Sequence, residues 1–303
     1  MIEISSVTKN FGSVRSLDNV SLKIDKGSIF GLIGSNGSGK STLLRILCGV
    51  YRQDKGEVLY DGVPVYEHTD VKRGIVYLSD DPYFGTSSTI ADMKRLYKSV
   101  YPTFAEEKYK RYLELFGLDE YRRLSTFSKG MQKQVSILLG LSAEAEYLLC
   151  DETLDGLDPV MRQTVRRIIA GEVAERDMCV IFASHNLKEI EDICDHVALL
   201  HRGKLLFEAG LDDIKLELHK IQVSFARERA EAMQTELSKL DTVSIERRGS
   251  LYTLVVRGRE DELSGAIEKL EPVFAEFIPL TLEEIFIAEM EENGYEFDEN
   301  IIG

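Results

Sequence analysis

Short apolar runs separated by glycine turns characterise the first 60 residues of the chain. Four of them have the length and flanking residues of β-strands: EISSVT, SLKI, SIFGLIG and GEVLYDG. A helical pattern, STLLRIL, follows the third run directly after the glycine-rich segment GSNGSGKS. We therefore expect the chain to begin as a β-α-β-like unit.

A helical pattern replaces the strands from about Pro82 to Ala145. Thr103 precedes Glu106 at the spacing of a capping box, which predicts the start of a helix. The large apolar residues that follow share one helical face and end before Gly117; they are Tyr109, Tyr112, Leu113 and Phe116. The pattern predicts a helical subdomain over about residues 82–145.

Two further apolar runs, YLLCDE and MCVIFASH, lie on either side of a predicted helix that begins at Pro159 behind an Asp158 cap. Strands that alternate with helices favour a parallel sheet covered on both faces. We therefore expect an α/β domain with a mostly parallel sheet over residues 1–210.

The composition becomes acidic after about Gly210. Residues 211–303 contain 10 Lys+Arg against 22 Asp+Glu, a net charge of −12, whereas the remainder has 27 against 30, or −3. Strand-like runs (IQVSF, VSIERR, LYTLVV) alternate there with helical stretches (ERAEAMQTELSKL, TLEEIFIAEM). We expect a small acidic α+β accessory domain over 211–303. Its charge would repel phosphodiester backbones, so no nucleic-acid partner is expected, although a solvated surface explains the charge equally well.

Neither the apolar stretches nor the first residues of the chain have the pattern of a membrane or secreted protein. No stretch approaches the roughly 18 uninterrupted apolar residues that a bilayer crossing needs. The start, MIEISSVTKN, lacks the basic and then apolar layout of a signal peptide. We therefore expect the protein to be cytoplasmic.

The segment GSNGSGKS, residues 34–41, fits the phosphate-binding pattern G-x-x-x-x-G-K-[ST] between a strand and a helix. Its glycines let backbone N–H groups point inward, and the helix N-terminus adds positive charge. Lys40 is predicted to reach the β- and γ-phosphates of ATP, and Ser41 to offer its hydroxyl to Mg²⁺. The alternative is a plain glycine turn. The predicted nucleotide contacts are Gly34, Ser35, Asn36, Gly37, Ser38, Gly39, Lys40, Ser41 and Thr42.

Two carboxylates, Asp151 and Glu152, end the apolar run YLLCDE. Open α/β sheets place their ligand sites at the carboxyl ends of such strands. Asp151 is predicted to hold hydrated Mg²⁺, and Glu152, which points differently because side chains alternate, to polarise the attacking water. Taken alone, two acids after an apolar run are usually a solvated strand end.

Three further segments follow in the order seen in ABC ATPases. FSKGMQKQ, residues 127–134, resembles the signature motif LSGGQ, GLD with the preceding Asp155 resembles the D-loop, and His185 in ASHN resembles the switch histidine. Residues 1 to about 210 therefore resemble the ATP-binding subunit of ABC transporters. The resemblance implies a P-loop NTPase fold of ABC type, with a mostly parallel sheet, an antiparallel β subdomain and a helical insert, which hydrolyses ATP.

The resemblance also implies an assembly and further site residues. Two subunits, either two copies or this chain with a paralogous ATPase, are expected to face head to tail, so that each signature segment covers the partner's nucleotide. His185 is expected to contact the γ-phosphate and Phe11 in NFG to stack on adenine, although a surface histidine and a core phenylalanine are the plain alternatives. The other expected nucleotide contacts are Ser128, Lys129, Gly130, Met131, Asp155 and Asp158.

Several positions depart from the family pattern. In YLSDDP, Asp80 stands where the Q-loop glutamine is usual; it could still bind Mg²⁺ or water but adds a negative charge. The signature carries Phe127, Lys129 and Met131 for leucine, glycine and glutamine, and Thr153 replaces a proline. These changes and the late TLEEIF resemble a bacterial branch that serves ABC-2-type permeases, often exporters. An integral membrane permease, docked on the helical insert and the Asp80 region, would then hold the protein at the inner face of the cell membrane.

Two other function classes compete with this one. A soluble ABC ATPase acting on nucleic acid or ribosomes would be expected to carry coiled-coil heptads, a second cassette or basic arms, and none is visible. A P-loop kinase would have no use for FSKGMQKQ or His185. The transporter ATPase is therefore the preferred hypothesis.

Replacing the loop lysine tests the phosphate-binding assignment. Lys40→Ala is expected to abolish nucleotide binding or weaken it severely, because the ammonium group offsets the charge of the β- and γ-phosphates. Titration with a fluorescent ATP analogue would measure the affinity. An unchanged dissociation constant would contradict the assignment of residues 34–41 as a phosphate-binding loop.

Overall fold

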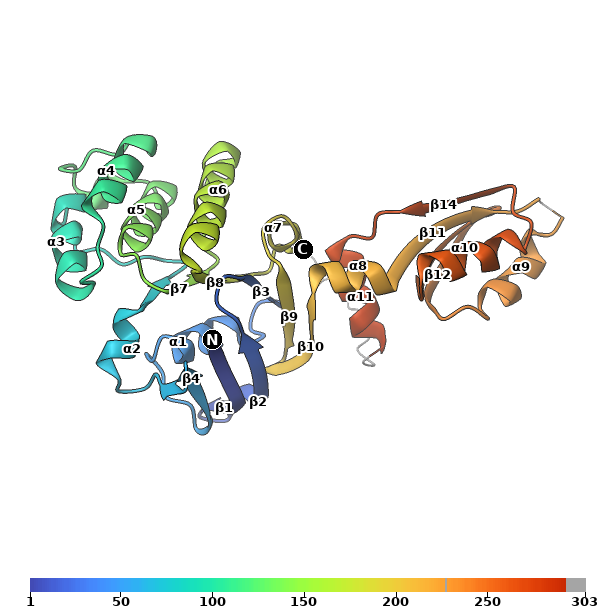
Figure 1. Cartoon of the computed structure of the whole chain (residues 1–303), viewed down its shortest axis with the longest axis horizontal. Helices are drawn as coiled ribbons and strands as arrows, with labels where there is room; N and C mark the ends of the chain where they lie inside the picture. Colours follow the sequence, from blue (N-terminus) through green and yellow to red (C-terminus); the bar gives the residue numbers. More distant parts are fainter. Residues whose placement is uncertain (227, 293–303) are drawn as a thin grey trace. The chain divides into compact units, whose positions relative to one another are not determined.

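The computed structural model describes residues 1–226 and 228–292, which divide into two compact units (Figure 1). The first unit is Met1–Glu208, and the second begins at Ala209. Within the described part of the chain, no helix combines the length and the apolar composition needed to cross a bilayer.

An antiparallel sheet of four strands, in the order β2-β1-β4-β5, opens the first unit. Its strands are β1 (Ile2–Phe11), β2 (Val14–Ile24), β4 (Lys55–Tyr60) and β5 (Val63–Pro64). Ile2 is paired with Ile24 on one side and with Tyr60 on the other, and all three side chains are buried. The alternating burial along β2 is that of a sheet with one face in the core. This sheet is the antiparallel subdomain that the family resemblance predicted.

A six-stranded sheet in the order β10-β9-β3-β8-β7-β6 forms the centre of the unit. Its strands are β3 (Ile29–Ile33), β6 (Ile75–Leu78), β7 (Tyr147–Asp151), β8 (Cys179–Ser184), β9 (His196–His201) and β10 (Lys204–Gly210). The pairs β3–β8, β3–β9, β7–β8 and β6–β7 are parallel, which confirms the predicted sheet. Every residue of β3, β7 and β8 is buried, which explains why their sequences are continuous apolar runs.

Helices connect these strands, and α3, α4 and α5 gather into one group at the upper left of Figure 1. The predicted apolar face of α4 is confirmed, since Tyr109, Tyr112 and Phe116 are buried. Gly117, with φ of 63°, stops the chain from continuing as a helix. The helical elements are α1 (Lys40–Leu47), α2 (Thr69–Arg73), α3 (Ile90–Val100), α4 (Glu106–Leu115), η1 (Leu124–Thr126), α5 (Lys129–Ser142), α6 (Pro159–Arg176) and α7 (Leu187–Glu191).

The predicted capping box at Thr103 is wrong. Helix α4 begins behind Ala105 without a side-chain cap, and the Thr103 hydroxyl instead donates to the Ala143 carbonyl at 2.7 Å. A tertiary acceptor has therefore replaced the local one. A capping box does occur at Thr89, whose hydroxyl accepts from the Asp92 amide at the start of α3. The predicted Asp158 cap of α6 is confirmed.

The second unit has the strand and helix order β-α-β-β-α-β, which is the ferredoxin-like split βαβ motif. Its antiparallel sheet has the order β12-β13-β11-β14. Helices α9 and α10 share one apolar core with β11 and β13. On the opposite face, Lys220 of β11 pairs with Glu284 of α11. The elements are α8 (Leu211–Glu217), β11 (Leu218–Ser224), α9 (Ala230–Leu237), β12 (Thr242–Arg248), β13 (Leu251–Arg257), α10 (Glu260–Glu268), β14 (Phe274–Ile278) and α11 (Leu282–Glu292).

The capping box of α3 gives a test of local stability. Thr89→Ala removes the hydroxyl that accepts from Asp92 and is expected to lower the free energy of unfolding by about 1 kcal/mol. Thr89→Ser keeps a hydroxyl at the cap and should lose much less. Urea unfolding followed by circular dichroism would measure both; equal losses for alanine and serine would contradict a capping role.

Candidate functional site

The glycine-rich loop joins the buried strand β3 to helix α1. Gly37 and Gly39 have φ of 78° and 110°, values that residues with a side chain rarely adopt. A Cβ on Gly39 would lie 2.6 Å from the Ser16 carbonyl oxygen, so the loop leaves no room for one. The Ser38 hydroxyl is buried in the loop without a hydrogen-bond partner among the described residues. A compact loop with an unsatisfied polar atom is suited to an anionic ligand.

Lys40 lies within this loop rather than on the surface. Its side-chain nitrogen donates to the carbonyls of Gly34 at 2.6 Å and Ser35 at 3.2 Å, and the residue is 5% exposed. Burial lowers the pKa of Lys40, and the negative charges of Glu152 and Asp151 oppose that effect. The ammonium group is thus held close to the site by backbone dipoles and by two carboxylates.

The Asp151 carboxylate is fixed through both of its oxygens. Ser41 donates to Oδ1 at 3.0 Å, and Tyr77 donates to Oδ2 at 2.8 Å. Burial, with the Asp151 charge, raises the pKa of Tyr77, so the phenol remains a neutral donor. No sequence motif marks Tyr77, so it was not among the predicted site residues. Its place follows from the pairing of β6 with β7, which sets Tyr77 opposite Leu149.

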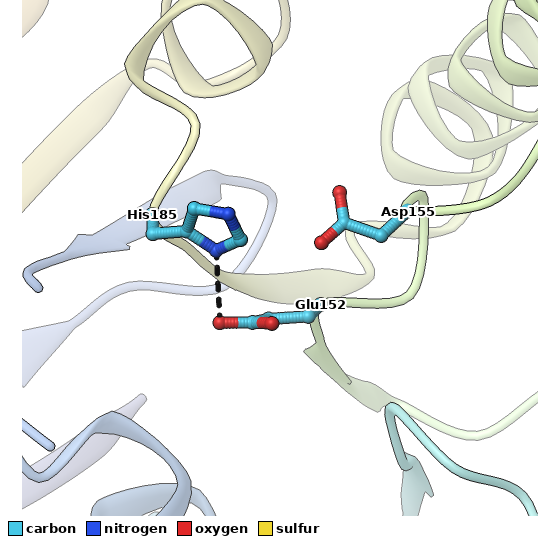
Figure 2. A group of neighbouring side chains, drawn as sticks. All are labelled: Glu152, Asp155 and His185. Carbon is cyan, nitrogen blue, oxygen red and sulfur yellow. Dashed lines mark hydrogen bonds and ion pairs between the residues drawn. The ribbon is translucent and has the colours of Figure 1, made fainter. Parts of the chain in front are cut away.

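Glu152 stands at the end of β7 with a positive φ of 47°, which a residue with a side chain seldom adopts. Its amide donates to the Ala183 carbonyl at 2.9 Å. Figure 2 shows its carboxylate beside His185, with 3.1 Å between Glu152 Oε1 and His185 Nδ1, and Asp155 facing both. Side-chain ligand atoms of the three residues all lie within 4.8 Å of one another. Three residues predicted from separate motifs are therefore neighbours in space.

The signature segment forms the start of helix α5. The Ser128 hydroxyl accepts from the Met131 amide at 3.2 Å and caps the helix. A Cβ on Gly130 would lie 2.7 Å from the Gly156 carbonyl oxygen, so the signature and the D-loop of one chain pack closely. Phe127 is 6% exposed, which accounts for an apolar residue at this position. The Arg122 guanidinium lies over its ring, 4.9 Å from the centroid, a contact that favours an aromatic side chain.

A cavity of about 180 Å³ lies between residues 80–82, the start of α5 and the D-loop. Asp80 is on its wall, and its Oδ1 lies 2.7 Å from the side-chain nitrogen of Lys133. Lys129 and Asp155 line the same cavity. The residue in the Q-loop position is thus joined to the signature helix by an ion pair.

Three further predicted site residues are Phe11, Thr42 and Asp158. Phe11 ends β1 and is 43% exposed, with its ring 5.4 Å from that of Tyr51 in an edge-to-face arrangement. The Thr42 hydroxyl accepts from Ser16 at 2.8 Å. The Asp158 carboxylate accepts from the amides of Val160 and Met161, both at 3.0 Å. Phe11 is therefore partly exposed, with the Lys9 side-chain nitrogen 5.4 Å from its ring centroid, whereas the Asp158 carboxylate is engaged as a helix cap.

Both the sequence and the fold have relatives of known family. The protein family described as ABC transporter matches residues 17–155. The ABC transporter ATP-binding protein YtrB of Bacillus subtilis (strain 168) is 34% identical over 292 residues, which span 95% of this chain and 97% of YtrB. The bacitracin transport ATP-binding protein BcrA of Bacillus licheniformis is 31% identical over 71% of each chain.

A solved structure has the same fold as the first unit. It is the dimeric post-hydrolysis state of the ATP-binding cassette MJ0796 bound to ADP and Pi, with a TM-score of 0.63 and 21% identity over 70% of this chain and 99% of that one. The predicted ABC-type P-loop fold is confirmed. Together with the near full-length match to YtrB, the glycine-rich loop of residues 34–41 and the strand-end carboxylates, this places the chain in the family of ABC transporter ATP-binding proteins, the subunits that bind and hydrolyse ATP.

Proposed function

We propose that this ATPase closes head to tail over two ATP molecules, with a second copy or a paralogous subunit, and thereby drives a separate integral membrane permease. The observation that carries the proposal is that two predicted anion-binding segments, the loop of residues 34–41 and the start of α5, have different contacts within one chain. Lys40 and Ser41 bond to their own loop and to Asp151, whereas the signature end bonds within α5 and packs on the D-loop. We infer that the signature segment of another subunit binds the phosphate from its other side. MJ0796, of the same fold, is dimeric.

The donor set at the loop suits Mg²⁺. The Ser41 hydroxyl and the Asp151 carboxylate supply hard oxygen atoms 3.0 Å apart, the ligand type that this ion prefers. When bound, the ion would neutralise charge on the phosphates. Tyr77 would hold the Asp151 carboxylate in position. Asp80 remains a predicted further ligand, although its Oδ1 is paired with Lys133.

Glu152 and His185 would act on the attacking water. The Glu152 carboxylate accepts a proton from water as the water oxygen forms a bond to the γ-phosphorus, and the bond to the ADP oxygen breaks, which yields ADP and inorganic phosphate. A proton on His185 Nδ1 lets the ring hold Glu152 Oε1, and the ring can then face the γ-phosphate through its other edge. Phe11 would stack on adenine. The signature contacts Ser128, Lys129, Gly130 and Met131 would serve the partner's nucleotide. Asp155 and Asp158 remain proposed nucleotide contacts, although the Asp158 carboxylate caps α6.

The direction of transport is proposed from similarity. BcrA, named for bacitracin transport, shares 31% identity with this chain, and the signature changes resemble the branch that serves ABC-2-type permeases. We assign ATP hydrolysis to residues 1–210, an accessory role to 211–303, and export to the assembly. The permease would dock on the helices of residues 82–145 and the Asp80 region and hold the ATPase at the inner face of the membrane. Co-purification with a membrane protein encoded next to it tests this; a partner that remains absent in detergent extracts would oppose it.

The tyrosine beside Asp151 gives a test of the metal site. Tyr77→Phe removes one hydrogen bond to a buried carboxylate, which is worth about 1.5–3 kcal/mol, and is expected to lower kcat/KM for MgATP by about tenfold or more. Steady-state phosphate release would measure it. Tyr101→Phe is the matched control, because its hydroxyl donates to the Ile75 carbonyl and not to the Asp151 carboxylate. Equal activity of the two variants would argue against a role for Tyr77.

The general base has a direct test. Glu152→Gln is expected to retain ATP binding and to slow turnover by about a hundredfold or more, because the amide cannot accept the proton from water. Binding and single-turnover hydrolysis would be measured on the same preparation. Because the closed state can no longer empty by hydrolysis, the variant should accumulate as a dimer with Mg-ATP.

Glu175→Gln, on the exposed surface of α6, is the control for loss of a charge. Near-normal hydrolysis by Glu152→Gln would refute the assignment of the base. A strictly monomeric sizing profile of that variant at saturating Mg-ATP would count against the head-to-tail dimer.

A further inference from the structure

We propose that Lys133 is a positioning residue for hydrolysis, which holds the main chain of Glu152 in place and is itself held by Asp80. The inference rests on the proposed role of Glu152 as general base. It assigns to Asp80 a function different from metal binding: the carboxylate in the Q-loop position anchors a lysine of the signature helix.

The geometry around Lys133 is that of a buried cation with two oxygen partners. Its side-chain nitrogen donates to Asp80 Oδ1 at 2.7 Å and to the Glu152 carbonyl at 2.9 Å. The Lys133 side chain is 9% exposed, whereas that of Asp80 is 57% exposed. A buried ammonium needs such partners, because an unpaired charge in the interior is costly. Lys133 therefore ties α5 to two segments that are distant in sequence.

The main chain of Glu152 adopts a conformation that neighbouring groups have to stabilise. Its φ of 47° is disfavoured for a residue with a Cβ and persists only where neighbouring groups hold it. The amide donates to Ala183 at 2.9 Å, and the carbonyl accepts from Lys133 at 2.9 Å and from the Asp155 amide at 3.3 Å. Because φ sets the direction of the side chain, these bonds also set where the carboxylate lies relative to His185.

Asp80 connects the hydrogen bond between Lys133 and the Glu152 carbonyl to the protein surface. It follows β6 and lies on the wall of the cavity between residues 80–82 and the signature helix. Any movement of residues 80–82 would therefore alter a partner of the lysine that also donates to the Glu152 carbonyl. Pairing the aspartate with a lysine also neutralises the charge that it adds next to the carboxylates. The pair thus couples an exposed segment to the conformation of Glu152.

A purely structural lysine would behave differently under substitution. Loss of packing or stability would lower the amount of folded protein but leave the kcat of the folded fraction unchanged. A misdirected Glu152 carboxylate would lower kcat and leave KM for MgATP nearly constant, since the phosphate-binding loop is intact. A positioning role is therefore indicated by a lower kcat at a nearly constant KM, measured on protein whose folded fraction is known.

The experiment measures ATP binding, kcat and KM of the full chain. Lys133→Met is expected to lower kcat by about tenfold or more, the scale of a misplaced catalytic group, with KM within about threefold. Lys133→Arg, which keeps the charge, should recover part of the loss, and Asp80→Asn should lower kcat by a smaller factor. Lys108→Met is the matched control, since that lysine pairs with Glu144 and Glu172 at 2.8 Å in another part of the unit.

Two double variants separate the possible causes. If Lys133 acts through Glu152, adding Lys133→Met to Glu152→Gln should change the residual single-turnover rate by less than about twofold. If Asp80 acts through Lys133, Asp80→Asn should have little effect when combined with Lys133→Met. The same preparations would be compared by thermal unfolding to establish that each variant is folded.

The outcomes distinguish this inference from the proposed function. A kcat of Lys133→Met within about twofold of the parent, or a full additional loss on top of Glu152→Gln, would overturn the positioning role. An Asp80→Asn effect that persists without Lys133 and shifts the Mg²⁺ concentration for half-maximal rate would make Asp80 a metal ligand instead. An active Glu152→Gln would refute the base assignment itself, whatever Lys133 does.

Discussion

The need to pair buried charge at one edge of the parallel sheet is the constraint on which the rest of the site depends. Lys40, Asp151 and Lys133 are 5%, 2% and 7% exposed, and each is held by polar partners. Burying such groups without partners would destabilise the fold, so the loop carbonyls, Ser41, Tyr77 and Asp80 are as necessary as the charged groups themselves. The parallel strands bring these partners together because their carboxyl ends meet at one edge.

The need to pair and pack buried groups also explains several departures from the family pattern. Asp80 would add an unbalanced negative charge at the Q-loop position, and Lys133 balances it. Thr153, where the family has proline, donates its hydroxyl to the Leu78 carbonyl at 3.3 Å and so ties the end of β7 to the end of β6. Phe127 is buried where the family has leucine. The substitutions therefore keep the packing of the site and change how its segments are connected.

The fold of the second unit is defined by the order and pairing of its strands and not by its acidic composition. The strands IQVSF, VSIERR and LYTLVV and the helical stretches ERAEAMQTELSKL and TLEEIFIAEM were predicted, whereas α10 and β14 were not. The sequence of β14, FAEFI, mixes polar and apolar residues at largely exposed positions. That strand pairs with β11 and completes the ferredoxin-like sheet. The net charge of residues 211–303 leaves this architecture unspecified, since acidic side chains on the surface are compatible with many folds.

The sequence alone determined the fold class, the glycine-rich loop between β3 and α1, the acids at the end of β7 and the family, because these depend on local patterns of apolar residues and on motifs in order. Only the tertiary structure decided where Thr103, Tyr77 and Lys133 act. Thr103 found an acceptor 40 residues away, Tyr77 reaches Asp151 across neighbouring strands, and Lys133 meets Asp80 at a separation of 53 residues. A hydrogen bond depends on distance in space, and no spacing along the chain records which distant donor and acceptor the packed core will bring together.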